Sequence, residues 1–202
     1  EWGAVCAVPV PSYVLYDFFV GVNGGRAEEA ELTEDFQLDP DAFAKIKAKV
    51  TIMPSPNNPT GNSFREKDIE EILSRSDGIV VIDEAYAEYS GKSMIRRVDE
   101  FDNLIVTRTF SKVYAMAGLR VGYAVANKEA ADMMNCVKIP YSLNALSEGA
   151  AIAAVRDRDF IERSVKLVKE QRPLLDAGLR KLGFETYPSD SNFIFAKSPI
   201  DH

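Results

Sequence analysis

The residues best equipped for chemistry stand together between Thr107 and Tyr123, a stretch that reads TRTFSKVYAMAGLRVGY. Lys112 can remain solvated, pair with a carboxylate or phosphate, or lose its proton and attack a carbonyl carbon as an amine. The hydroxyls of Thr109 and Ser111 and the guanidinium of Arg120 suit a phosphate dianion. A lysine beside such a set indicates a phosphorylated aldehyde that is held at both ends.

Composition restricts the other kinds of chemistry. The one histidine is His202, at the end of the sequence, so histidine-based triads, metal ligands and general bases are not expected. Cys6 and Cys136 are far apart and show no paired spacing, which indicates neither a disulfide framework nor a thiolate zinc site and favours a reducing cytoplasm. Lysine, carboxylate, tyrosine or a cofactor must therefore do the chemistry.

Length and charge are those of a globular protein. The chain has 202 residues, of which 46% are hydrophobic and 27% charged, and it can bury a core. A net charge of -7 argues against binding to nucleic acid or to an anionic membrane. We also find no apolar run of membrane-spanning length and no signal-peptide pattern.

Short apolar runs and longer amphipathic stretches alternate along the sequence, which predicts an α/β protein with a mostly parallel sheet and right-handed crossovers. The strands are expected at Ala4–Val8, Ala27–Leu32, Val50–Met53, Gly78–Ile82, Leu104–Val106 and Val121–Ala126. Two further strands, Phe184–Tyr187 and Asn192–Ala196, are expected to begin a second lobe.

The helices are predicted from their polar starts and their stops. Ser12 is expected to cap the first helix, and Ser63 with Glu66 to form a capping box for a helix that ends near Arg75. The remaining helices are expected at Asp39–Lys49, Lys128–Lys138, Ser147–Val155 and Asp159–Leu182.

Thr109-Phe110-Ser111-Lys112, followed by Ala117-Gly118-Leu119-Arg120-Val121-Gly122-Tyr123, resembles the pyridoxal-phosphate (PLP) lysine motif of fold-type I aminotransferases. Within that group the chain is most similar to histidinol-phosphate aminotransferases. Three further segments match in the family's order, and the resemblance covers nearly the whole sequence. They are Pro11–Tyr16, Pro54–Gly61 and Asp83–Tyr86.

The resemblance implies a role for each matching residue. Lys112 would bind PLP covalently, Asp83 would pair with the protonated pyridine nitrogen, and the hydroxyl of Tyr86 would contact the phenolic oxygen. The amide of Asn58 would bond the same oxygen, and Tyr13 would stack on the ring.

The phosphate of the cofactor would be held by Thr109, Ser111 and Arg120. Arg108 flanks the same loop but does not match the family's phosphate contact. Glu84 and Glu88 match no role, and we interpret them as local charge.

The fold implied by the resemblance is a three-layer α/β/α large domain with the start of a small C-terminal lobe. We expect a PLP-binding large domain at residues 1–155, and a linking helix with an incomplete small domain at 156–202. The family's glycine-rich phosphate loop would precede Glu1, and its carboxylate-binding arginine would follow His202. The sequence is therefore expected to be a fragment, and its activity alone is open.

The implied reaction is amino transfer between histidinol phosphate and 2-oxoglutarate in histidine biosynthesis. The implied assembly is a cytoplasmic homodimer with Pro140–Asn144 at its interface. A decarboxylase of a phosphorylated amino acid or an aromatic amino-acid aminotransferase would share every residue named above. A non-catalytic PLP-binding domain would keep the fold without turnover. A nucleotide-binding α/β protein with Mg²⁺ on Asp83 is disfavoured, because no glycine-rich loop joins a strand to a helix.

Overall fold

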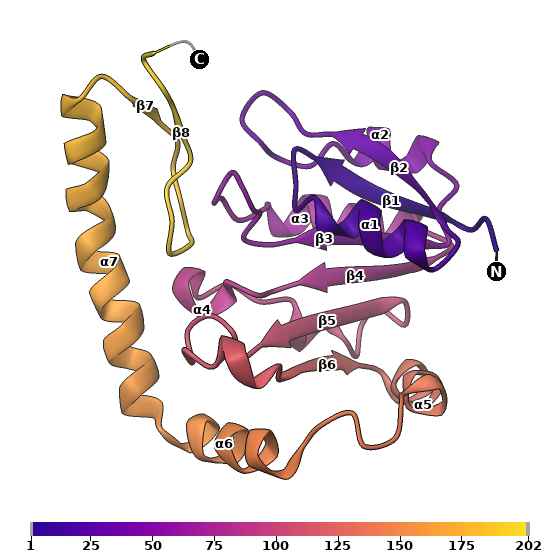
Figure 1. Ribbon diagram of the computed structural model, residues 1–202. Helices are drawn as coiled ribbons and strands as arrows, with labels where there is room; N and C mark the ends of the chain where they lie inside the picture. The colour runs from indigo at the N-terminus through magenta and orange to yellow at the C-terminus, as the bar shows by residue number, and fades with distance from the viewer. Residues whose placement is uncertain (1, 201–202) are drawn as a thin grey trace.

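The computed structural model describes residues 2–200 and consists of a six-stranded sheet, covering helices and a small two-stranded sheet (Figure 1). The order in the large sheet is β2-β1-β3-β4-β5-β6; β1 to β5 are parallel, and β6 runs antiparallel to β5. The strands are β1 (Val5–Val10), β2 (Arg26–Glu31), β3 (Val50–Pro54), β4 (Ile79–Asp83), β5 (Leu104–Thr109) and β6 (Gly122–Ala126). This is the α/β fold that the alternating pattern predicted.

Helices cover both faces of the sheet. The helices that lie against it are α1 (Leu15–Val22), α2 (Pro40–Lys45) and α3 (Glu66–Arg75), with the short α4 (Ala87–Ser90) at the end of β4. α2 and α3 close the larger core, whose fully buried centre includes Met53, Ile82 and Leu104. The opposite face holds a smaller cluster in which Tyr16 of α1 packs with Cys6 and Val8.

β4 and the first half of β5 are apolar, and one face of both lies in the larger core. On that face the side chains of Val80, Ile82, Leu104 and Val106 are fully buried. Val81, on the other face of β4, is only partly buried. β2 and β6 are the two edge strands, and the Glu-rich sequence of β2 keeps its edge charged.

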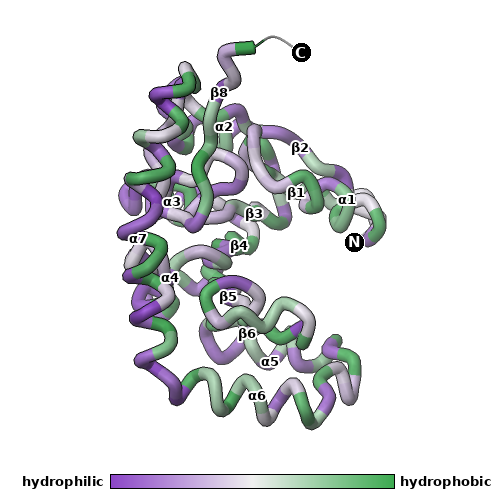
Figure 2. Tube along the Cα trace, turned by 60° about the vertical axis from the view of Figure 1, so that its left-hand side comes forward, coloured by the Kyte–Doolittle hydropathy of each residue, from purple (hydrophilic) through white to green (hydrophobic). Residues whose placement is uncertain are grey.

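After β6 the chain runs around the outside of the sheet. α5 (Lys128–Val137), α6 (Ala145–Arg156) and the long α7 (Arg158–Lys181) form an arc that returns to β7 (Glu185–Thr186) and β8 (Ala196–Lys197). Figure 2 shows apolar, green stretches along α5, α6 and their connection. The division into domains at residues 155 and 156 stays a prediction.

Several local expectations about helix and strand ends were wrong. Ser12 does not cap α1, because its hydroxyl donates to Oδ1 of Asn57 at 2.9 Å. Ser63 does not cap α3, which begins after Arg65 without a side-chain cap. α2 ends at Lys45 instead of Lys49, and residues 192–195 are not in a strand.

Among the described residues 2–200, no helix has both the length and the apolar composition needed to cross a membrane.

Candidate active site

A cavity of about 470 Å³ opens at the carboxyl ends of β3, β4 and β5, beside the start of α1. The chain leaves β1 toward β2 on one side and reaches β3 on the other, so the strand order reverses between β1 and β3. Open α/β sheets bind ligands at such a switch point, outside the carboxyl ends of the strands. All eight residues singled out from the sequence line this cavity: Tyr13, Asn58, Asp83, Tyr86, Thr109, Ser111, Lys112 and Arg120.

Asp83, the last residue of β4, is the buried acid of the cavity. Its Oδ2 accepts a hydrogen bond of 2.9 Å from the hydroxyl of Tyr16, and its Oδ1 accepts one of 3.0 Å from the N–H of Ala85. Burial raises the pKa of the Asp83 carboxyl above its ordinary value, although the Tyr16 bond, the Ala85 bond and the charge of Lys112 lower it in part. The carboxylate thus lies in a place that favours a cationic partner.

Tyr16 is a site residue that the sequence analysis did not assign. Burial and the neighbouring Asp83 raise the pKa of its hydroxyl, which therefore keeps its proton and donates. Tyr13 lies just before α1 and Tyr16 lies inside it, and their rings meet edge to face at 5.5 Å. The only sequence signal for Tyr16 was its closeness to Tyr13, because its bond to Asp83 joins residues 67 positions apart.

The lysine loop after β5 is held by two buried anchors. Phe110 and Val113 are buried in separate apolar clusters, whereas Lys112 between them is exposed. The N–H of Ser111 donates to Oγ1 of Thr109 at 3.0 Å, which tightens the turn. Packing on both sides therefore projects the lysine into the cavity.

Lys112 and Tyr86 approach each other inside the cavity. The Nζ of Lys112 lies 4.9 Å from the centre of the Tyr86 ring, within range of a cation–π contact. The Tyr86 ring is buried, and Phe193 packs against it edge to face at 5.2 Å. The C-terminal segment therefore supports a residue of the cavity wall.

The loop that carries Asn58 is built on its buried neighbour, Asn57. Asn57 accepts from Ser12 and donates through Nδ2 to the carbonyl of Pro11 at 3.0 Å and to Oγ1 of Thr60 at 2.7 Å. These bonds join the end of β1 to the loop after β3, on the two sides of the switch point. Asn58 is thereby placed on the cavity wall without being part of the scaffold.

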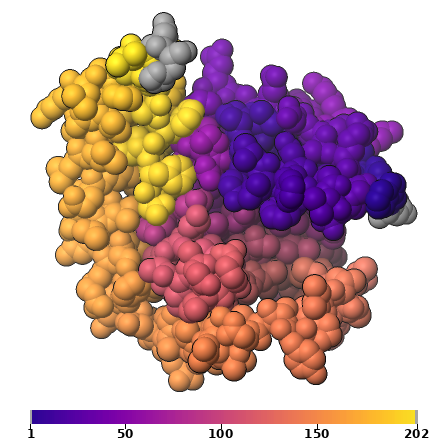
Figure 3. Space-filling view, in the orientation of Figure 1, coloured from indigo at the N-terminus to yellow at the C-terminus, as the bar shows by residue number. Residues whose placement is uncertain are grey.

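The C-terminal segment closes over the same loop, where Figure 3 shows the yellow residues against the magenta ones. The N–H of Asp190 donates to the carbonyl of Gly61 at 2.8 Å. Gly61 has a φ of +81°, and a Cβ there would stand 2.7 Å from Oγ of Ser189. Both conditions require glycine at this position.

Arg120 lies at the end of the cavity where Thr109 and Ser111 present their hydroxyls. It follows the short turn Ala117–Leu119, has a left-handed φ of +55°, and donates through Nη1 to the carbonyl of Ala117 at 2.7 Å. The guanidinium is exposed and retains further donors. This end of the cavity is suited to an anion.

Glu84, which we interpreted as local charge, is buried in an ion pair. Glu84 is 1% exposed, and its carboxylate accepts from the guanidinium of Arg108 at 2.7 Å and from Oγ of Ser93 at 2.8 Å. Glu88 accepts from the same guanidinium at 2.7 Å. The charged residues after β4 thus form a partly buried network beside the cavity.

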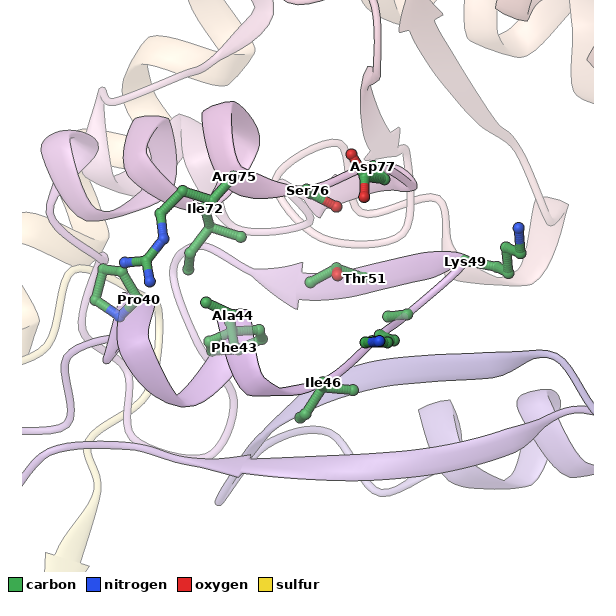
Figure 4. A pocket seen from close by; sticks show the side chains of 12 residues that line it. Pro40, Phe43, Ala44, Ile46, Lys49, Thr51, Ile72, Arg75, Ser76 and Asp77 are labelled. Carbon is green, nitrogen blue, oxygen red and sulfur yellow. The ribbon is translucent and has the colours of Figure 1, made fainter.

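A second cavity, of about 400 Å³, lies between α2, α3 and the start of β3 (Figure 4). Its arginine, Arg75, is engaged by Asp41 and Glu71 at 2.8 Å each. It stands by the amino end of β3, away from the edge where parallel sheets bind ligands. Residues 2–200 also contain no group of three or more histidine, cysteine or acidic side chains arranged for a metal.

Comparisons with known proteins give the following matches. Histidinol-phosphate aminotransferase from Thermoanaerobacter sp. (strain X514) is 40% identical over 200 residues, which are 96% of this chain and 57% of that protein. The structure of histidinol-phosphate aminotransferase from Clostridium acetobutylicum matches with a TM-score of 0.90 at 26% identity, over 96% of this chain and 61% of that one. The enzyme from Sinorhizobium meliloti, in complex with pyridoxal-5'-phosphate, matches with a TM-score of 0.89 at 25% identity, over 96% and 55%.

This chain spans little more than half the length of the curated relatives it matches. The sequence profile of the family described as aminotransferase class I and II matches residues 3–199, nearly its whole length. The chain therefore belongs to the class I and II aminotransferase family.

Proposed function

We propose that the full-length protein is a PLP-dependent aminotransferase that transfers the amino group of histidinol phosphate to 2-oxoglutarate. The observation that carries the proposal is that Lys112 and Asp83 line one cavity with a set of anion donors beside them. The substrate assignment rests on the curated relatives, which are named histidinol-phosphate aminotransferases. Because the chain spans only part of their length, the proposal concerns the full-length protein.

The residues of the cavity fit PLP by their chemistry. A buried carboxylate with a raised pKa, Asp83, suits a protonated ring nitrogen. An exposed lysine amine, Lys112, suits an aldehyde. Thr109, Ser111 and Arg120 offer hydroxyl and guanidinium donors to a phosphate. The cavity volume of about 470 Å³ is within the range of small-molecule sites.

When bound, PLP supplies an electron sink for the substrate carbon that carries the amino group. Asp83 would keep a proton on the ring nitrogen, and Tyr86 and Asn58 would hydrogen-bond the ring oxygen. Tyr13 would cover the ring face. The Nζ of Lys112 would accept the proton that leaves the substrate carbon.

The lysine assignment is tested by chemical trapping. Borohydride reduction of the PLP-loaded full-length protein, followed by peptide mapping, is expected to show a pyridoxyl group on Lys112, because this amine lines the cavity beside the anion donors. Lys128 is an exposed lysine outside the cavity and serves as the internal control. Label on Lys128 in place of Lys112 would overturn the proposed function.

The burial of Asp83 predicts a gain in stability when its charge is removed. The pKa of Asp83 is higher in the folded state than in the unfolded state, where it is about 3.9. The charged carboxylate therefore lowers the free energy of unfolding as the pH rises from the unfolded-state pKa to the folded-state pKa. In the cofactor-free chain, Asp83→Asn is therefore expected to raise the free energy of unfolding at pH 7. The gain should vanish as the pH falls through that window, as measured by urea unfolding.

Asp190 provides a control of opposite sign. Burial alone would raise its pKa, but hydrogen bonds from Ser63 and Lys92 and the charge of Lys92 hold that pKa below its ordinary value. Asp190→Asn should therefore lower the free energy of unfolding at pH 7 and lose its effect in acid. If Asp83→Asn lowered the free energy of unfolding at pH 7, contacts within the chain would already stabilise the charged carboxylate. Asp83 would then not require a cationic ligand.

We propose further that the full-length protein is a homodimer with Tyr141 and Leu143 at its interface. Tyr141 is 100% exposed, and apolar neighbours on both sides, Ile139 and Leu146, are also exposed. A contiguous apolar surface of this kind indicates an interface. A closed two-fold arrangement would bury the same patch on both copies.

Light scattering tests the interface. Tyr141→Glu should convert the dimer to a monomer, because it places a charge in the buried patch without disturbing any contact within the chain. Leu174→Glu on α7 is the control, since Leu174 is also exposed but lies outside the patch, and it should remain dimeric. A Tyr141→Glu variant that stays dimeric would place the interface elsewhere.

We also place the protein in the cytoplasm. Cys6 and Cys136 are both unpaired, and the implied reaction is a biosynthetic one.

A further inference from the structure

The ends of β4 and β5 carry two pairs of adjacent residues with different surroundings. Asp83 and Thr109 line the cavity. The residues next to them, Glu84 and Arg108, meet in a buried ion pair, with side chains only 1% and 12% exposed. Arg108 also contributes to the cavity wall, whereas Glu84 does not. Each member of the ion pair is one residue away from a site residue.

The ion pair is part of a larger cluster, which we call the Glu84–Arg108 cluster: Glu84, Glu88, Ser93 and Arg108, with the N–H of Met94. The guanidinium contacts three side chains: Nε donates to Glu84 at 2.7 Å, Nη1 to Glu88 at 2.7 Å and Nη2 to Ser93 at 3.0 Å. Ser93 in turn donates to Glu84 at 2.8 Å. Only a planar fork with several fixed donors makes all three contacts at once.

The backbone explains why a side-chain link is needed here. The ladder between β4 and β5 ends with Asp83 opposite Thr107, and its last bond runs from the N–H of Glu84 to the carbonyl of Thr107 at 2.9 Å. On its other edge β5 pairs with β6 from Ile105 to Thr109, and this pairing continues past the end of the β4–β5 ladder, with Arg108 opposite Tyr123. The chain after β4 turns away into α4. The Glu84–Arg108 pair joins the two strands where the backbone bonds have ended.

Stability alone is a weak explanation for such a pair. The free-energy cost of removing two charges from water often exceeds the gain from their mutual attraction. Apolar residues of similar volume can therefore frequently replace a buried ion pair without loss of stability. The cluster is also unbalanced, because one arginine faces two carboxylates and Oε2 of Glu88 is buried without a partner. What the cluster does supply is fixed geometry at the edge of the site.

Building on the proposed function, we propose that the Glu84–Arg108 ion pair positions the two ends of the PLP site relative to each other. It holds Asp83, at the end of β4, at a set distance from the loop that carries Thr109 and Lys112. Glu84 does not line the cavity, and all three guanidinium nitrogens of Arg108 already donate within the cluster, so we assign both residues a positioning role. Loss of the Arg108 guanidinium should move Lys112 relative to Asp83. Small displacements of reacting groups lower the reaction rate strongly.

The test compares two arginine-to-lysine variants in the PLP-loaded full-length protein. Arg108→Lys keeps the charge but loses the three-way fork. Arg97→Lys is the matched control, because Arg97 also joins several acids, Glu66, Glu70 and Glu100, but does so away from the cavity. The readouts are kcat, KM, the pH midpoint of the visible absorption band of bound PLP, and the melting temperature.

Arg108→Lys is expected to lower kcat by on the order of 10-fold and to shift the pH midpoint of the band. Arg97→Lys should lower the melting temperature without either change. Ser93→Ala removes one hydroxyl of the cluster and no charge, so it should shift the midpoint in the same direction by less. Ser93→Ala replaces Arg108→Lys as the test variant if Arg108→Lys does not fold.

Each other outcome has a defined meaning. A normal midpoint and kcat in Arg108→Lys, or in Ser93→Ala where it stands in, would overturn the positioning role and leave the proposed function intact. Equal shifts in Arg97→Lys would show a general loss of stability and would also overturn it. If the unsubstituted protein bound no PLP, the proposed function would fail, and this inference with it.

Discussion

The structure of the site depends on one constraint, which is that a carboxylate at the end of a buried parallel strand must find partners. Asp83 is held there by β4, whose other residues are apolar and whose Val80 and Ile82 lie in the larger core. One oxygen is satisfied by its own backbone at Ala85 and the other by the hydroxyl of Tyr16. Neither partner carries a positive charge, which leaves the site complementary to a cationic group in the cavity.

The surrounding elements follow from this constraint. α1 must begin beside the strand ends so that Tyr16 reaches Asp83, and the Asn57 bonds fix that start against the loop after β3. The lysine loop is fixed from the other side by the buried Phe110 and Val113. Three strand ends thus converge on a single cavity although the residues that line it come from distant parts of the sequence.

Much of this arrangement could be predicted from sequence because the informative residues stand at strand ends. The apolar run before Asp83 predicts a doubly covered strand, and a parallel sheet brings its carboxyl end next to that of β5. The strand order and the pairing partners of the strands could not be predicted in this way. That Glu84 meets Arg108, 24 residues later, depends on the register of β4 against β5, which no local pattern specifies.

One capping error has the same origin. Ser12 has a good local signal for a helix start, but its hydroxyl bonds Asn57, which is 45 residues away. Competition from distant partners is invisible in a window of a few residues. Tyr16 was missed because its role depends on a contact with a residue 67 positions away.

The most direct measurement is a crystal structure of the full-length protein with PLP. The account predicts continuous density from Nζ of Lys112 to the cofactor, with the ring nitrogen within about 2.7–2.9 Å of an Asp83 carboxylate oxygen, the range for charge-assisted bonds. It also predicts the phosphate at Thr109, Ser111 and Arg120. Density with the phosphate turned toward Asp83, or PLP bound away from this cavity, would contradict it.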